Sequence, residues 1–349
     1  MRIGVVGAGV VGLATTFALD RLGVEVRCFE AGEPMAARSV GGTRIFRLAH
    51  AEPRLVAYAA RALEGWRAWE REAGTRLVGT ETTVVSGPAA PERFASMREA
   101  GAAATLVDDV ADAGALPAAP GTTGPVLVDP AGGVIAAAST GRFLAGAVEP
   151  LLHHERVEAI PVGTGGDGAT IRTPTGSWAC DSVVVAAGEA TASLVAPLGI
   201  GVPDGRAHHV RFTFPLPDAG SRPCWIDDGA ASTTGLHTYQ HASGPDSWAV
   251  GASMPAADCA WELGRDEVRA RSLAAVAAYV REVVVGADAD TVTEEVYCSL
   301  PPGLGDGVGA ARTGPVLAVW GDNLFKFAPA LGEDLARAAA DGTVPTIAA

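Results

Sequence analysis

The chain has 349 residues, of which 48% are hydrophobic and 19% are charged, as is typical of a globular protein with an ample core. Its net charge of −14 and its isoelectric point near 4.9 argue against nucleic acid or an anionic membrane as the main partner. The length predicts about two domains.

The cysteines and the N-terminal segment indicate the environment of the protein. The five cysteines are widely spaced and include no Cys-x-x-Cys pair, so neither a zinc site nor a disulfide framework is indicated. The chain begins on a strand-like segment and not on a signal-peptide pattern, and no apolar run is long enough to span a bilayer. We therefore expect a cytoplasmic protein that binds no metal and no membrane.

Residues 1–30 read as a strand, a glycine-rich turn, a helix and a second strand. Gly7, Gly9 and Gly12 form a G-x-G-x-x-G pattern directly after an apolar run. Such glycines allow a tight turn, close approach of the backbone to a pyrophosphate, and close packing of the helix on the strand. Glu30 ends the second strand, where its carboxylate would accept hydrogen bonds from ribose hydroxyls. The segment predicts a dinucleotide site and leaves FAD and NAD open.

An arginine-rich segment follows at residues 38–47, Arg-Ser-Val-Gly-Gly-Thr-Arg-Ile-Phe-Arg. Arg44 and Arg47 stand three apart after a glycine pair, so they could place two cations on one side of a turn and form an anion pocket. A solvated helix face is the alternative. Apolar spacing then predicts an amphipathic helix over about residues 53–72, with its tryptophans in the core.

Two later features also point to a ligand site. Residues 182–188 read as a buried strand that ends in a turn at Gly188, and Lys326 is the single lysine among 26 basic residues. Lysine offers a compact ammonium group that adapts to burial, whereas arginine offers a wide planar fork. The position of Lys326 between Phe325 and Phe327 predicts an ammonium group in an apolar pocket that faces a ligand. A chance surface remnant is the alternative.

Four segments together resemble a known family. They are the glycine turn with Glu30, Gly-Gly-Thr-Arg-Ile-Phe-Arg-Leu-Ala-His at 41–50, Val-Tyr-Cys-Ser-Leu-Pro-Pro at 296–302, and Gly-Asp-Asn-Leu-Phe-Lys-Phe-Ala-Pro-Ala-Leu-Gly-Glu at 321–333. In this order and approximate spacing the chain resembles the FAD-dependent amine oxidoreductases around monomeric sarcosine oxidase and N-methyltryptophan oxidase. That group belongs to the D-amino-acid-oxidase-like flavoproteins.

The resemblance implies an α/β (α+β two-domain) fold in which a Rossmann-like FAD-binding domain is interleaved with an antiparallel-sheet substrate domain. We expect the FAD-binding domain from residues 1–80, 132–203 and 303–349. We expect the substrate domain from residues 81–131 and 204–302, including a helix near its C-terminal end.

The resemblance also implies roles for individual residues. By motif position, Arg47 and Lys326 match the pair that holds a substrate carboxylate, and Arg44 matches an arginine that lies against the flavin ring. Structural ion pairs in an acidic protein are the alternative for all three cations. The residues expected to bind FAD are Gly7, Gly9, Gly12, Glu30, Arg38, Ser39, Thr43, Gly188, Cys298, Gly321, Phe325 and Lys326.

Cys298 matches the cysteine that links covalently to the flavin in sarcosine-oxidase-like enzymes. Without the resemblance it would read as a core cysteine, the usual fate of a free thiol. The chain departs from the family at the second lysine, which activates oxygen there: Ala249 stands near that position. Either Lys326 or another cation therefore promotes reaction with dioxygen, or the electrons pass to a different acceptor.

Histidines on predicted strands are further candidates. One imidazole of the pair His208–His209 could face a pocket, and His237 and Tyr239 share one strand face that could border a substrate. Sheet-face residues without a role are the alternative.

We expect a monomer or small homo-oligomer that oxidises the C–N bond of a small amino acid, imino acid or N-alkyl amino acid, amine to imine, by hydride transfer to FAD. The electron acceptor would be dioxygen or another oxidant. Two alternatives stay open. One is a dehydrogenase or tailoring enzyme of secondary metabolism that acts on a bulkier or carrier-linked amine without a free carboxylate. The other is a non-catalytic flavin-binding protein.

Overall fold

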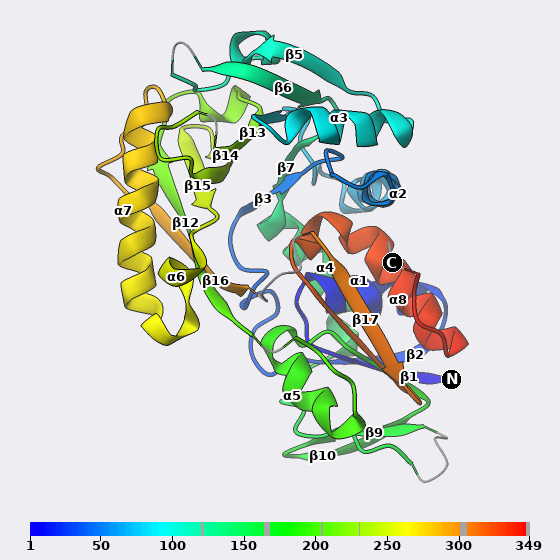
Figure 1. The fold of residues 1–349 in the computed structure, drawn as a ribbon. Helices are drawn as coiled ribbons and strands as arrows, with labels where there is room; N and C mark the ends of the chain where they lie inside the picture. The colour runs from blue at the N-terminus through cyan, green and yellow to red at the C-terminus, as the bar shows by residue number, and fades with distance from the viewer. Residues whose placement is uncertain (120–121, 164–167, 204, 230, 301–305, 347–349) are drawn as a thin grey trace. The chain divides into compact units, whose positions relative to one another are not determined.

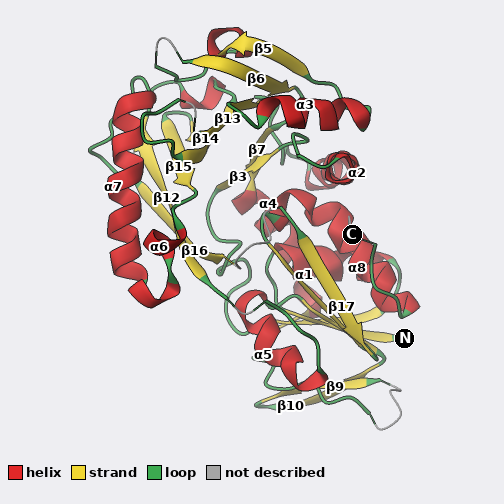
Figure 2. Cartoon of the chain, viewed as in Figure 1, coloured by secondary structure: helices red, strands yellow, loops and turns green. Residues whose placement is uncertain are grey.

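The computed structural model describes residues 1–349 except 120–121, 164–167, 204, 230, 301–305 and 347–349. The chain divides into two compact units, each built from separated segments. Unit 1 comprises Met1–Val40, Ala138–Gly205 and Pro301–Ala349, and unit 2 comprises Gly41–Ala137 and Arg206–Leu300. The mixed helix and strand content is visible in Figure 2. The predicted α/β class is confirmed.

The segment 41–80 groups with unit 2, whereas the sequence placed it in the FAD-binding domain. Strand β3 (Thr43–Phe46) pairs antiparallel with β7 (Gly133–Ala136), and Val78 bridges Ile135. These pairings tie both ends of the segment into unit 2. The functional assignment of the two domains stays a prediction.

Unit 1 is built on a six-stranded sheet in the order β17-β18-β11-β1-β2-β8. Its strands are β1 (Arg2–Val6), β2 (Glu25–Phe29), β8 (Leu152–His153), β11 (Ser182–Val185), β17 (Val308–Thr313) and β18 (Val316–Gly321). The pairs from β8 to β18 are parallel, and β17 closes one edge antiparallel to β18. Parallel strands are covered on both faces and read as continuous apolar runs. All four residues of β11 are accordingly buried.

The remaining elements of unit 1 are helices around this sheet and one small hairpin (Figure 1). The helices are α1 (Val10–Arg21), α4 (Ala137–Val148, whose first residue belongs to unit 2), α5 (Thr191–Val195) and α8 (Ala328–Asp341). The short 3-10 helices are η2 (Glu149–Leu151), η3 (Gly188–Ala190), η4 (Ala196–Leu198) and η7 (Leu324–Phe327). The hairpin strands are β9 (Ala169–Thr173) and β10 (Gly176–Cys180).

Helix α1 packs closely against α8, and a glycine permits the contact. A Cβ atom on Gly332 would lie 2.7 Å from the backbone of Ala14. We expect Gly332→Ala to lower the free energy of unfolding by about 1–3 kcal/mol, the usual effect of overpacking. Urea unfolding measures this change. Gly146→Ala is the matched control: a Cβ there meets nothing within 4 Å in α4, so it should raise stability by about 0.5–1 kcal/mol. Equal stabilities of the two variants would contradict the close contact.

Unit 2 is built on an eight-stranded sheet in the order β16-β12-β15-β14-β13-β4-β6-β5. Its strands are β4 (Thr83–Ser86), β5 (Thr105–Asp109), β6 (Thr123–Asp129), β12 (Ala207–Pro215), β13 (Cys224–Asp228), β14 (His237–Gly244), β15 (Ser247–Ala252) and β16 (Glu294–Leu300). Neighbours are antiparallel except β13 and β4, which are parallel. The predicted antiparallel sheet is confirmed.

The helices of unit 2 are α2 (Pro53–Ala73), α3 (Ala90–Glu99), α6 (Ala256–Cys259) and α7 (Arg265–Val283), with short 3-10 helices η1 (Val110–Ala113), η5 (Ala219–Ser221) and η6 (Trp261–Leu263). Helix α2 confirms the amphipathic helix predicted from the sequence, and its Trp66 and Trp69 are buried. No helix among the described residues is long and apolar enough to cross a membrane.

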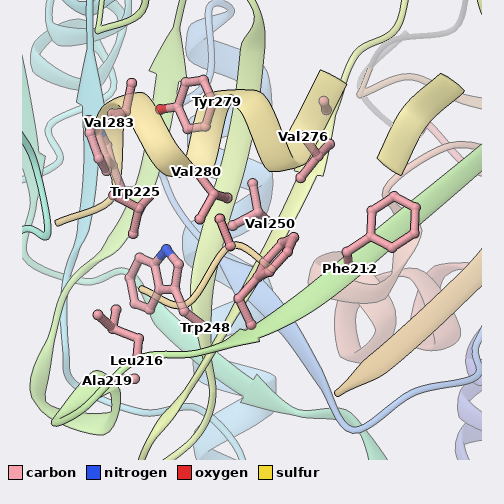
Figure 3. Close-up of a cluster of buried hydrophobic side chains, with 14 of the residues drawn as sticks. Phe212, Leu216, Ala219, Trp225, Trp248, Val250, Val276, Tyr279, Val280 and Val283 are labelled. Carbon is pink, nitrogen blue, oxygen red and sulfur yellow. The ribbon is translucent and has the colours of Figure 1, made fainter. Parts of the chain in front are cut away.

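The core of unit 2 lies between one face of the sheet and α7. Figure 3 shows Phe212 and Trp248 from the strands in the same apolar cluster as Val276 and Val280 from the helix. Because side chains alternate along a strand, the residues between these core positions point to the opposite face. That opposite face carries the polar side chains described below.

Candidate functional site

The glycine-rich turn of unit 1 joins β1 to α1. Gly7 has φ +101°, a conformation that other residues rarely adopt, and a Cβ atom on Gly12 would lie 1.8 Å from the carbonyl oxygen of Gly7. Gly9 differs, because its added Cβ would meet only the Ser39 hydroxyl oxygen, at 3.2 Å. Gly7 and Gly12 are thus required by the fold, whereas a side chain at Gly9 would be limited by the Ser39 hydroxyl alone.

Two predicted cofactor-binding residues contact this turn directly. Glu30 accepts hydrogen bonds from the backbone N–H of Ala8 at 2.7 Å and of Gly32 at 2.9 Å. Ser39 accepts from the N–H of Val10 at 3.0 Å, at the first residue of α1. A glycine turn, an acidic residue at the end of β2 and a helix N-terminus form the arrangement that holds the ribose and pyrophosphate of a dinucleotide. The residues therefore fit an adenine dinucleotide such as FAD.

Arg38, predicted to bind cofactor, is engaged with the end of β18. Its guanidinium donates to the carbonyl of Gly321 at 3.0 Å and to the Asp322 carboxylate at 2.9 Å. Burial raises the pKa of Asp322, although the charges of Arg38 and Lys326 partly oppose this. The contacts bring Arg38 and Gly321 together, and they give Arg38 a structural ion pair.

Lys326 lies in η7 and is almost completely buried. Its ammonium group donates to the carboxylate of Asp306 at 2.8 Å and lies 5.2 Å from the ring centroid of Phe327. The neighbouring Phe325 is also buried. Two phenylalanines therefore flank the ammonium group as expected, and Asp306 is a partner that no pattern in the sequence indicates.

Gly188 stands where β11 gives way to η3, with φ +57°. It belongs to unit 1, as do the turn glycines, Glu30, Arg38, Ser39, Gly321, Phe325 and Lys326. The other predicted site residues, Thr43, Arg44, Arg47 and Cys298, belong to unit 2.

The polar face of the unit 2 sheet gathers side chains from three strands. Cross-strand register places His209 opposite Cys298, and Thr213 opposite Glu294. Alternation along the strands puts the following residues on this face, which we call the polar face: His209, Arg211 and Thr213 of β12, His237, Tyr239, His241 and Ser243 of β14, and Glu294 and Cys298 of β16. His209, His237, Tyr239 and Cys298 were already candidates from the sequence.

Two arginines of unit 2 share one acceptor. The carbonyl oxygen of Thr43 accepts from Arg44 at 2.7 Å and from Arg211 at 2.8 Å. Burial and then the charge of Arg211 lower the pKa of Arg44 to about 10, and burial lowers the pKa of Arg211. Glu294 is the nearby carboxylate, 3.8 Å from Arg211. One partly buried and one buried cation beside one carboxylate leave an excess positive charge that would attract an anionic group.

Arg211 is the functional candidate that sequence reasoning missed. It is 4% exposed, and its Nε and Nη2 atoms make no hydrogen bond to any described residue. The sequence did carry a signal, because an arginine interrupts the run His-His-Val-Arg-Phe-Thr-Phe of a predicted strand. A buried charge without full hydrogen bonding is costly, and a bound ion or ligand is one explanation for it.

His241 accepts from Arg211 at 3.3 Å, since a guanidinium can only donate. Burial and then the Arg211 charge lower the pKa of His241 well below its usual range. At high pH the imidazole is neutral in both the folded and unfolded states. Below about pH 6.5 His241 is protonated in the unfolded state but stays neutral in the folded state. The free energy of unfolding therefore falls as the pH falls.

We expect His241→Gln to remove this contribution. Between about pH 6.5 and 5 the wild-type unfolding free energy should lose up to about 1.4 kcal/mol per pH unit more than that of the variant. Chemical unfolding of both proteins across this range gives the two slopes. Parallel slopes would show that His241 is protonated in the folded state.

Arg47 follows β3 and lies near a buried carboxylate. Burial raises the pKa of Asp129, while backbone N–H groups of Leu48 and Ala49 and the charge of Arg47 oppose this shift. Leu48 and Ala49 both donate to Asp129. Asp129 therefore fixes the backbone directly after Arg47.

Cys298 is half-buried, and its sulfur lies 3.5 Å from Nδ1 of His209. The Nε2 atom of His209 lies 2.9 Å from the Tyr239 hydroxyl. Three other cysteines, Cys28, Cys180 and Cys224, are buried, and burial raises the pKa of each. Cys298 thus has polar neighbours, whereas those three lie in the core.

Comparisons with known proteins agree with this geometry. The family described as "FAD dependent oxidoreductase" matches residues 2–338. No curated protein sequence matches the chain significantly. Among solved structures, the open form of NikD, an unusual amino acid oxidase essential for nikkomycin biosynthesis, is 19% identical, with a TM-score of 0.80 over 98% of this chain and 94% of that chain.

Two further solved structures have the same fold. L-proline dehydrogenase from P. horikoshii is 16% identical, with a TM-score of 0.79 over 99% of this chain and 94% of that chain. Glycine oxidase from Geobacillus kaustophilus is 15% identical, with a TM-score of 0.73 over 99% and 96% of the two chains.

Proposed function

The chain belongs to the family of FAD-dependent oxidoreductases, and from this premise we propose that it oxidises the C–N bond of a small amino acid, imino acid or N-alkyl amino acid, amine to imine. FAD supplies the hydride acceptor when bound. The similar structures named above include an amino acid oxidase, a proline dehydrogenase and a glycine oxidase. These names support a C–N bond as the site of oxidation.

Arg47 and Lys326 would hold the substrate carboxylate. An arginine can fork onto a carboxylate with two parallel hydrogen bonds, and an ammonium group adds a point charge. Lys326 pairs with Asp306, so the substrate carboxylate would have to share Lys326 with Asp306 or displace it. Positive charge around the substrate would also keep its amine neutral, which hydride loss requires.

Dioxygen is the electron acceptor that we propose. The partly buried Arg44 and the buried Arg211 provide positive charge on the polar face, and the chain lacks the oxygen-activating lysine of the family it resembles. Positive charge would stabilise both a reduced flavin and an oxygen anion. The same pair is the observation that most strongly supports an anionic ligand at this face.

Binding of FAD would use the turn glycines, Glu30 and Ser39 of unit 1, with Thr43 and Arg44 of unit 2 nearer the ring. We propose a thioether bond between Cys298 and the flavin, a cytoplasmic location, and a monomer or small homo-oligomer. Acid precipitation tests the bond: yellow colour should stay in the wild-type pellet and move to the supernatant in Cys298→Ala. A colourless wild-type pellet would contradict it.

Anaerobic mixing with a panel of amines tests the proposed reaction. At least one small amino or imino acid should bleach the visible band of the oxidised flavin, and admission of air should restore it. A flavin that dithionite bleaches but no amine bleaches would support a non-catalytic binding protein. Bleaching that only an artificial acceptor reverses would make the protein a dehydrogenase.

One observation favours a second candidate function, oxidation of a carrier-linked or bulkier amine without a free carboxylate. Asp306 already neutralises Lys326, and such a substrate would leave this ion pair intact. In that case amides should bleach the flavin at least as well as the corresponding free acids.

A further inference from the structure

We propose that His209, positioned by Tyr239, is the general base that takes the thiol proton of Cys298 and thereby enables this cysteine to bond to FAD. The inference rests on the proposed covalent cofactor. His209 and Cys298 are register partners on the neighbouring strands β12 and β16. Their reactive atoms, Nδ1 and Sγ, lie 3.5 Å apart, within the distance of a hydrogen bond to sulfur.

Tyr239 reaches His209 across an intervening strand. In the sheet order, β15 separates the β14 strand of Tyr239 from the β12 strand of His209. The tyrosine hydroxyl nevertheless lies 2.9 Å from Nε2, and the two rings stack with centroids 5.7 Å apart and planes 18° apart. The crossing occurs at Gly251, where a Cβ atom would lie 2.1 Å from the tyrosine ring. A side chain at position 251 would therefore displace Tyr239.

The hydroxyl of Tyr239 can accept a hydrogen bond from Nε2 of His209, and the proposed base requires this tautomer. If Nε2 carries the hydrogen and donates it to Tyr239, Nδ1 presents its lone pair to the thiol. Once Nδ1 takes the proton, the imidazolium keeps the same hydrogen bond through Nε2. The tyrosine thus orients the base without itself changing protonation.

Two arginines lie close enough to Cys298 to interact with its charge. The other ionisable groups on or against the polar face are His209, Tyr239, His241, Glu294 and His237, which pairs with Asp228. Arg44 and Arg211 are close enough to Cys298 for its negative charge to raise the pKa of each, in opposition to the larger effect of burial. Nearby cations activate a cysteine by stabilising its thiolate.

Formation of a thioether between Cys298 and the flavin is a two-electron oxidation. The thiol proton passes to Nδ1 of His209, and the sulfur lone pair forms the bond to the 8α carbon of the flavin. One hydrogen leaves that carbon as a proton, and the two electrons of the broken C–H bond stay in the ring, which is thereby reduced. A two-electron acceptor such as dioxygen, which becomes hydrogen peroxide, restores the oxidised ring.

The first test measures covalent incorporation of FAD into full-length apoprotein made in riboflavin-limited cells. Flavin fluorescence in a denaturing gel reports the bound fraction over time. We expect His209→Asn to slow incorporation by about 100-fold or more, the usual contribution of a general base, and Tyr239→Phe to slow it less. Total FAD retained under native conditions should match the wild type, which separates loss of the bond from loss of binding.

His208→Asn is the matched control. His208 lies next to His209 on the same strand but bonds to the Tyr297 hydroxyl at 2.8 Å and to the carbonyl of Trp261 at 3.1 Å. Its removal should leave the incorporation rate unchanged. Equal rates for His209→Asn and His208→Asn would overturn the proposed base.

The second test needs no flavin. Iodoacetamide should alkylate Cys298 of the apoprotein. Peptide mass spectrometry then distinguishes the modified Cys298 from Cys259, which is also half-buried. In wild type the rate should reach its plateau at a lower pH than in His209→Asn, which should follow an ordinary thiol. Superimposed pH profiles would overturn the activation of Cys298 by His209.

The two tests distinguish this inference from the tether on which it rests. Flavin that leaves the wild-type protein on acid denaturation would contradict the tether and, with it, the bond-forming role of His209. A tethered wild type whose incorporation and alkylation do not change in His209→Asn would contradict the role of His209 alone.

Discussion

Lys326→Met is expected to lower kcat/KM for carboxylate-bearing amines by about 30- to 1000-fold. Loss of one partner of a buried charge pair costs about 2–4 kcal/mol, which corresponds to this range. The almost complete burial of Lys326 supports the upper part of the range. Steady-state kinetics on a free amino acid and on its amide measure the effect. If Lys326 binds the carboxylate, the amide should lose much less than the acid.

Asp306→Asn separates a carboxylate clamp from a structural ion pair. Asp306 accepts from both Lys326 and the side-chain amide of Asn323, and asparagine keeps an oxygen for these donors while it removes the charge. A clamp predicts that Asp306→Asn lowers KM for the free acid, because Lys326 loses its competing carboxylate. A structural pair predicts that Lys326→Met and Asp306→Asn both reduce unfolding stability and affect acid and amide equally.

Gly9→Ala and Gly12→Ala are expected to impair FAD binding for different reasons. The Cβ of Gly12→Ala would collide with the carbonyl oxygen of Gly7, so this variant should lose about 1–3 kcal/mol of apoprotein stability as well as cofactor. The Cβ of Gly9→Ala would meet only the hydroxyl of Ser39. Its apoprotein should therefore lose less stability than that of Gly12→Ala, because a side-chain hydroxyl can shift where a backbone carbonyl cannot. Its methyl group would occupy the space of the pyrophosphate and weaken FAD binding by at least about 10-fold.

Fluorescence titration of each apoprotein with FAD measures its affinity for the cofactor, and urea unfolding measures its stability. Wild-type affinity in Gly9→Ala would contradict the assignment of this turn to the pyrophosphate. Loss of stability in Gly9→Ala equal to that in Gly12→Ala would mean that the turn is crowded at both positions.

Features set by local sequence could be predicted well. The G-x-G-x-x-G turn and Glu30 lie within one β-α-β segment, so their spacing alone brings the carboxylate to the N–H of Ala8. Helix α2 likewise follows from its apolar period. In both cases the interacting groups are close in the chain, and the periodicity of one element determines which side chains meet.

Features set by long-range strand register could not be predicted. Arg211 and Arg44 share the carbonyl of Thr43 because β12 brings residue 211 to the segment around β3, and no local pattern encodes that meeting. Tyr239 reaches His209 only because Gly251 leaves the intervening strand without a side chain. The sequence indicated some of these residues as candidates, but it did not indicate which side chains they would contact.

The same limit applies to Lys326. Its burial followed from the flanking phenylalanines, whereas its partner Asp306 stands twenty residues earlier, before β17. A carboxylate in a glycine-rich stretch of sequence carries no pattern that marks it as the partner of a given lysine. The clamp of Arg47 and Lys326 joins residues of different units and remains a prediction for kinetics to test.

Anaerobic flavin reduction by a matched pair of substrates tests the proposed function most directly. A small amino or imino acid and its amide, mixed separately with the holoenzyme, differ in the carboxylate alone. We predict that the acid bleaches the flavin at least about 30-fold faster at low substrate concentration, in proportion to the lost charge contacts. Equal bleaching by the two compounds would contradict recognition of a carboxylate, and bleaching by neither would contradict amine oxidation itself.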